Sequence, residues 1–141
     1  MPRFLNRAMG LRGLALLAIA FGALTIKEGG GVLFGPDAER AAAGDYVPFV
    51  LWSNFLLGFA YVAAGLGLWL RQVWSLWLSA AILIATLATF AAFALHIALG
   101  GAHELRTLVA MSIRTLVWAF IFLAARSLLR AGGARSAPSG S

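Results

Sequence analysis

Residues 95–114 read LHIALGGAHELRTLVAMSIR and bring several titratable groups together between two apolar segments. The run leaves one long apolar segment, turns at Gly100–Gly101, and enters the next. Both histidines of the chain, His96 and His103, fall inside it, together with Glu104, one of only five acidic residues. Because ionisable groups are rare and costly within membrane segments, this run predicts where function is concentrated.

The composition around this run is that of a membrane protein. Of the 141 residues, 62% are hydrophobic and 11% are charged, whereas a soluble domain carries about 25% charged residues. The net charge of +6 does not indicate nucleic-acid binding, because the basic residues flank apolar segments and form no basic face. The absence of cysteine excludes thiol–disulfide chemistry, iron–sulfur clusters and zinc–thiolate sites.

Four apolar segments predict an all-α fold, an integral membrane four-helix bundle in which successive helices run up and down. We expect the spans at residues 8–28, 47–70, 73–99 and 105–129, in a single domain over residues 1–131. Lys27 and Glu28 are expected to close the first span, and residues 38–43 to form a short surface helix. Residues 132–141, GGARSAPSGS, predict a disordered tail.

The N-terminal segment has two interpretations. Arg3, Arg7 and Arg12 before a short apolar run also fit a cleaved secretory signal. We favour a retained helix, because counting back to Ala8 gives the length that a span needs.

The basic residues also predict an orientation with both termini in the cytoplasm. Arginines are concentrated at the two termini and at the turn between the second and third spans, and the positive side of a membrane protein stays inside. All five acids and both histidines then lie at the outer end. The arginines on the inner side are Arg3, Arg7, Arg12, Arg71, Arg126, Arg130 and Arg135.

Arg114 is the most informative single residue. It lies ten positions after Glu104, which is about 15 Å along a helix. A guanidinium at that depth must either extend outward along its aliphatic stem or find an acceptor. The nearest acids are Glu28 and Glu104, with Asn54 and Tyr61 as neutral partners, and a structural ion pair and a functional contact to an anion or substrate are both open. Such an ion pair predicts that Arg114→Leu destabilises the bundle.

Helical spacing predicts which side chains face inward. One stripe of the third span, for which packing is favoured over function, consists of Ser75, Ser79, Ile82, Thr86, Thr89, Phe93 and His96. In the second span, Asn54, Gly58, Tyr61 and Gly65 share a face that allows a close helix contact. The full candidate binding cluster is Glu28, Asn54, Tyr61, His96, Glu104, Arg106 and Arg114.

A metal or haem site is the alternative use of the same region. His96, His103 and Glu104 carry donor atoms that suit zinc, copper or iron, and Met111 could serve as an axial haem ligand. The spacing of these residues matches no established zinc pattern, so the identity of any cofactor stays open.

The segments LHIALGGAHELRTLVAMSIRTLVW and YVPFVLWSNFLLGFAYVAAGLGLWL resemble a group of small four-span bacterial inner-membrane proteins, similar in outline to the DoxX-like class. The resemblance concerns topology over most of the chain and assigns no site residue. It implies a location in the bacterial cytoplasmic membrane, and some members of the class accompany redox enzymes.

These observations favour a non-catalytic accessory, assembly or binding subunit with a polar cluster at its periplasmic end. Its expected partners are the lipid bilayer and a larger membrane or periplasmic protein, or a second copy of the chain. One alternative is a redox- or metal-associated protein that uses His96, His103 and Glu104. A second alternative is a small proton- or anion-coupled transporter.

Overall fold

The computed structural model describes residues 3–133 and places four long helices and one short helix in them. In chain order these are α1 (Arg3–Phe34), α2 (Asp37–Ala43), α3 (Pro48–Trp69), α4 (Trp74–Ala98) and α5 (Leu105–Gly133). No strand occurs in this described part of the chain, so the all-α prediction is confirmed. All four long helices are long and apolar enough to cross a membrane, over Asn6–Phe34, Pro48–Trp69, Trp74–Ala98 and Leu105–Arg130.

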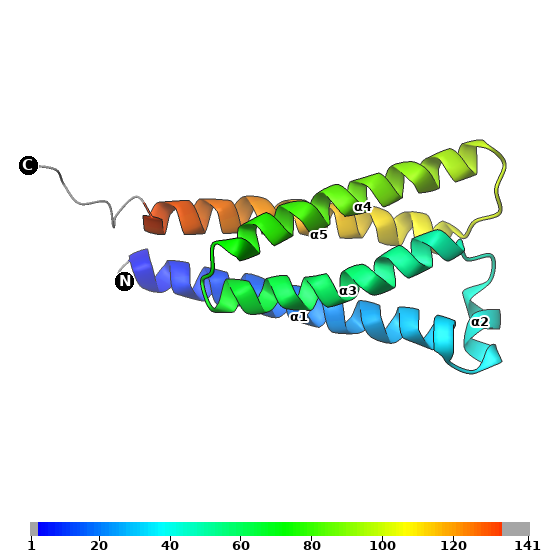
Figure 1. The fold of residues 1–141 in the computed structure, drawn as a ribbon, viewed down its shortest axis with the longest axis horizontal. Coiled ribbons are helices and arrows are strands. Elements are labelled where there is room, and N and C mark those ends of the chain that lie inside the picture. Colours follow the sequence, from blue (N-terminus) through cyan, green and yellow to red (C-terminus); the bar gives the residue numbers. More distant parts are fainter. Residues whose placement is uncertain (1–2, 134–141) are drawn as a thin grey trace, which may run out of the picture.

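The long helices run alternately up and down, as the short connections require (Figure 1). The start of α1 and the end of α5 lie at one end of the bundle, with the α3–α4 turn. The opposite end carries α2 and the loop between α4 and α5. Each long helix contacts two others, so that α1, α3, α4 and α5 form a closed ring in that order.

The most extensive helix contact joins α1 to α3. It is close because glycines of α3 let the two backbones approach, as the shared face of Gly58, Tyr61 and Gly65 predicts. A Cβ atom at Gly65 would lie only 2.6 Å from Ile19 Cγ1 and 2.9 Å from the Ala15 carbonyl oxygen. This interface therefore depends on the absence of side chains at the contact.

The hydroxyl-bearing stripe of α4 also faces inward. Ser75, Ser79, Thr86 and Phe93 are fully buried. Ser79 donates to the Ser75 carbonyl oxygen at 2.7 Å, one turn back in its own helix. The stripe thus serves packing and local bonding, as predicted.

Two boundaries differ from the sequence-based prediction. The first helix continues through Gly29–Gly31 to Phe34, six residues beyond its predicted end at Glu28. The glycines do not break it, because Gly29 packs closely against Phe55 of α3, where an added Cβ atom would lie 3.1 Å from Phe55 Cβ. The helix ends instead before Pro36, since the residue that precedes a proline disfavours helix.

The last helix also extends further than predicted. It includes Gly132 and Gly133, which the sequence assigns to the tail. The rest of the predicted tail, residues 134–141, lies outside the described residues. The short surface helix expected over residues 38–43 is present as α2.

Gly100 ends α4 in a conformation that favours glycine. Its φ is +85°, and nothing lies within 4 Å of the position its Cβ would take. We therefore expect Gly100→Ala to lower the free energy of unfolding by about 1 kcal/mol through backbone strain alone. Gly13→Ala is the control, because Gly13 lies in open space within α1 and alanine should stabilise that helix. Thermal unfolding in detergent measures both changes. If both variants were stabilised, or both destabilised, the result would contradict the expectation.

Candidate functional site

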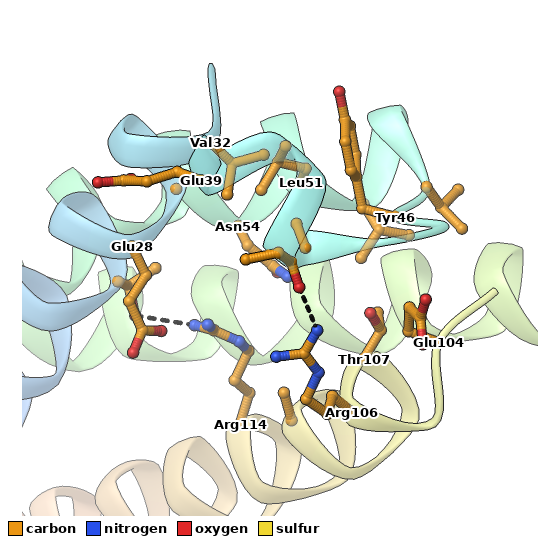
Figure 2. Close-up of a pocket in the computed structure, with 17 residues that line it drawn as sticks. Glu28, Val32, Glu39, Tyr46, Leu51, Asn54, Glu104, Arg106, Thr107 and Arg114 are labelled. Carbon is orange, nitrogen blue, oxygen red and sulfur yellow. Dashed lines mark hydrogen bonds between the residues drawn. The ribbon is translucent and has the colours of Figure 1, made fainter. Parts of the chain in front are cut away.

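A cavity of about 460 Å³ lies at the end of the bundle that carries α2. It is bounded by α1, α2, α3 and the first three turns of α5, while no described residue of α4 lines it. In Figure 2, Glu28 and Arg114 lie beside each other, while Tyr46 and Glu39 point away from them. The lining residues are Thr25, Glu28, Gly29, Val32, Glu39, Ala42, Ala43, Tyr46, Val47, Val50, Leu51, Asn54, Glu104, Arg106, Thr107, Ala110 and Arg114.

Arg114 forms the inner wall of this cavity. Its residue surface is only 9% exposed, and one terminal nitrogen, Nη1, donates to Thr25 Oγ1 at 2.9 Å. The guanidinium also lies over the ring of Phe21, 5.4 Å from the ring centre. Its Nε is buried and has no hydrogen-bond partner among the described residues. An unmet buried donor costs about 1–3 kcal/mol, and more when it is charged.

The predicted ion pair of Arg114 is wrong. The one ion pair in the described residues joins Arg40 to Asp37 at 3.1 Å, on the exposed surface of α2. Neither Glu28 nor Glu104 pairs with Arg114, and its acceptor is the hydroxyl of Thr25, which the sequence did not single out. Threonine is common in membrane helices and usually bonds its own backbone, so its type gave no signal.

Glu104 and Arg106 fasten the polypeptide that covers the cavity. The Glu104 carboxylate accepts a hydrogen bond from the Asp45 backbone N–H at 2.8 Å. Arg106 donates to the Ala42 carbonyl oxygen at 2.8 Å, which is one of the dashed lines in Figure 2. Together these bonds tie residues 42–45, at the end of α2, to the start of α5. Glu104 and Arg106 therefore use part of their hydrogen-bonding capacity to hold the backbone, and not to bind a ligand.

Asn54 and Glu28 make fewer hydrogen bonds within the protein. The Asn54 amide nitrogen donates to the sulfur of Met111 at 3.4 Å, and its buried oxygen Oδ1 has no partner in the described part of the chain. Glu28 is exposed at the mouth, and Figure 2 shows it on the same side of the cavity as Arg114. The cavity lining therefore combines a buried cation, Arg114, with an exposed anion, Glu28.

Tyr61 and His96 do not line this cavity, although the sequence placed them in the same cluster. Tyr61 is fully buried deeper in the bundle, with its ring 5.8 Å from Phe21 and 4.8 Å from Trp118 between centres. The helical face of Tyr61 was predicted, but its depth places it in the core. His96 lies 3.0 Å from the Ala102 carbonyl oxygen through Nε2 and closes the turn that follows α4.

The alternative metal ligands are also separated by the fold. His103 Nδ1 lies 3.2 Å from the Gly101 carbonyl oxygen, and Met111 is fully buried against Asn54. Among the described residues, no group of three or more histidine, aspartate or glutamate side chains has the geometry of a metal site. The structure therefore does not assemble His96, His103 and Glu104 into a ligand set.

Further lining residues were not predicted. Glu39 reaches the cavity from α2, Tyr46 from the loop before α3, and Thr107 from the first turn of α5. Thr107 shares the helical stripe of Met111 and Arg114, which is the signal that could have identified it. Glu39 and Tyr46 depend on how α2 folds over the bundle, which the sequence pattern does not specify.

Comparison with protein-family models gave no match, and comparisons with curated proteins and with solved structures gave none either. The resemblance to the DoxX-like class accordingly stays a prediction.

Proposed function

We propose that this protein crosses the bacterial inner membrane four times, with both termini in the cytoplasm. Large apolar side chains such as Trp77, Ile84 and Leu116 are about 70% exposed (73%, 67% and 71%) on the outside of the bundle. Such a surface requires lipid as its solvent. The arginine-rich end, where Arg12 lies 5.2 Å from the ring centre of Trp69, suits the cytoplasmic interface.

Single introduced cysteines test this orientation by maleimide labelling. The wild-type chain gives no background labelling, because it contains no cysteine. In intact spheroplasts, we expect a membrane-impermeant maleimide to label His103→Cys. Gln72→Cys, which is also exposed but lies in the α3–α4 turn, should react only after the membrane is permeabilised. The reverse pattern would invert the proposed orientation, and labelling of both cysteines from outside would contradict the four-span arrangement.

The function that the site supports best is non-catalytic binding of a small ligand, in an accessory or binding subunit. One observation carries this proposal: the buried Arg114 lines the cavity, and its terminal nitrogen Nη2 makes no hydrogen bond to a described residue. A buried guanidinium with a terminal nitrogen open to a cavity can donate charge-assisted hydrogen bonds to an anionic group of a ligand. The cavity volume of about 460 Å³ is also within the range of small-molecule sites, about 300–1,000 Å³.

Native mass spectrometry of the full chain, released from mild detergent, tests this function. We expect a non-covalent adduct on the wild-type protein that disappears in Arg114→Gln, because the amide removes the charge. Arg126→Gln is the matched control, since Arg126 lies on the same helix but is exposed and outside the cavity. An adduct-free wild type, or an adduct that persists in Arg114→Gln, would overturn the proposal.

The two alternative functions have less support. The proposed redox or metal function lacks an assembled ligand set in the described residues. A transporter needs a path from the cavity toward the cytoplasmic end, where Trp118, Leu68 and Ile121 are fully buried in one packed cluster. A larger protein partner remains part of the accessory role that we propose.

A further inference from the structure

We infer that the ligand of this cavity is a zwitterion, with its anionic group on Arg114 and its cationic group on Glu28. This inference rests on the proposed binding function and names the chemical class of the ligand. The shared chemistry is a carboxylate or phosphate oxygen a few bonds from an ammonium group, joined to an apolar part.

One nitrogen of the Arg114 guanidinium is free to bind a ligand. Nη1 donates to Thr25, and Nε is buried without a partner among the described residues. The second terminal nitrogen, Nη2, makes no hydrogen bond to a described residue and is not one of the buried unpartnered atoms. Nη2 can donate to an oxygen of a carboxylate or phosphate in a charge-assisted hydrogen bond. Thr25 thus holds Arg114 in place and leaves Nη2 to recognise an oxyanion.

The charges around the cavity do not suit a purely anionic ligand. Three glutamates line the cavity (Glu28, Glu39 and Glu104) against two arginines (Arg106 and Arg114). Glu104 and Arg106 already bond the backbone that covers the site. A ligand with only negative charge would therefore meet Glu28 and Glu39 at the exposed mouth, with no excess of positive charge to offset them. An added ammonium group turns this repulsion into attraction.

Glu28 stands close to the point where Arg114 is anchored. Thr25 and Glu28 are three residues apart on α1 and share one helical face. Their separation along the axis is about 4.5 Å. Glu28 consequently lies about one turn from the anchor of Arg114, and Figure 2 shows the two side chains beside each other at the cavity.

The lining also provides room for an apolar part of the ligand. Val32, Val50 and Leu51 supply aliphatic surface beside these charged groups. Two sources of ligand combine all these features: a free amino acid with an aliphatic side chain, and the headgroup of phosphatidylethanolamine at the membrane surface.

Ligand analogues that lack one of the two charges test each charge separately. Leucine carries both, 4-methylpentanoate lacks the ammonium group, and 3-methylbutylamine lacks the carboxylate. For the lipid source, phosphatidylethanolamine is compared with phosphatidylglycerol in mixed micelles. The readout is the thermal unfolding temperature of the full chain, titrated with each probe to obtain an apparent affinity.

We expect leucine to bind at least about tenfold more tightly than 3-methylbutylamine, because Arg114 is buried. Leucine or phosphatidylethanolamine should bind about two- to fivefold more tightly than its anionic counterpart, because Glu28 is exposed. Glu28→Gln should remove that preference while the anionic counterpart still binds. Asp45→Asn is the control, because this exposed acid does not line the cavity.

Equal binding of 4-methylpentanoate and leucine, unaffected by Glu28→Gln, would leave an anion-binding site and overturn the zwitterion. An adduct in native mass spectrometry without binding of either zwitterionic probe would overturn it too, while the binding function itself would stand. If the adduct is also absent, the binding function fails as well.

Discussion

Replacing Gly65 with leucine is expected to prevent the protein from folding. A Cβ at this position already lies 2.6 Å from Ile19 Cγ1 and 2.9 Å from the Ala15 carbonyl oxygen, so a branched side chain must push α1 away from α3. Overpacking in a core costs about 1–3 kcal/mol where side chains can shift. Here the added side chain would meet helix backbone, which cannot shift easily, at the most extensive contact in the bundle. We therefore expect a greater loss in the free energy of unfolding. Size-exclusion chromatography in detergent should show aggregate instead of a monodisperse peak.

Gly13→Leu is the matched control for this experiment. Gly13 lies on α1 with nothing within 4 Å of its Cβ position, so leucine there should project outward and be tolerated. A monodisperse Gly65→Leu protein with an unchanged unfolding temperature would contradict the close α1–α3 contact.

Arg114→Leu is expected to abolish ligand binding and leave the unliganded protein as stable as before, or more stable. The sequence predicts the opposite, because it assumes that leucine would strand a buried acid. No carboxylate pairs with Arg114 in the described residues, and Glu28 is exposed. Leucine therefore removes a desolvated charge and an unmet donor at the expense of one bond to Thr25, whose hydroxyl can bond its own helix.

The measurement is thermal unfolding of ligand-free protein, with Arg126→Leu as the control at an exposed site of the same helix. We expect the free energy of unfolding to stay within about 1 kcal/mol of the wild type or to rise. A loss of more than about 2 kcal/mol would indicate that Arg114 holds a buried acid, and the sequence-based ion pair would be right.

The sequence predicts the arrangement of helices well, because apolar length and helical spacing are local properties. The four long helices, the turns at Arg71–Gln72 and Gly100–Gly101, and the inward faces of α3 and α4 all follow from them. The end of α1 does not. Three consecutive glycines after a charged pair resemble a helix stop, but their packing against Phe55 of α3 is a tertiary contact.

The candidate site is only partly predictable for the same reason. Helical faces bring Asn54, Glu104 and Arg114 toward a common region. The pairing of Arg114 depends on the rotation of α1 against α5, which presents Thr25 and not an acid. His96 lies on the predicted stripe of α4, but the turn at Gly100 folds the chain back over it, and its ring meets the Ala102 carbonyl oxygen.

An experimental structure of the full chain in lipid nanodiscs, at a resolution that shows bound molecules, tests the central claim most directly. We predict density of a non-protein molecule in the cavity, with an oxygen about 2.7–3.2 Å from Nη2 of Arg114. A guanidinium that instead pairs with the Glu28 carboxylate, or that meets only ordered water, would contradict the claim that this cavity is a ligand site.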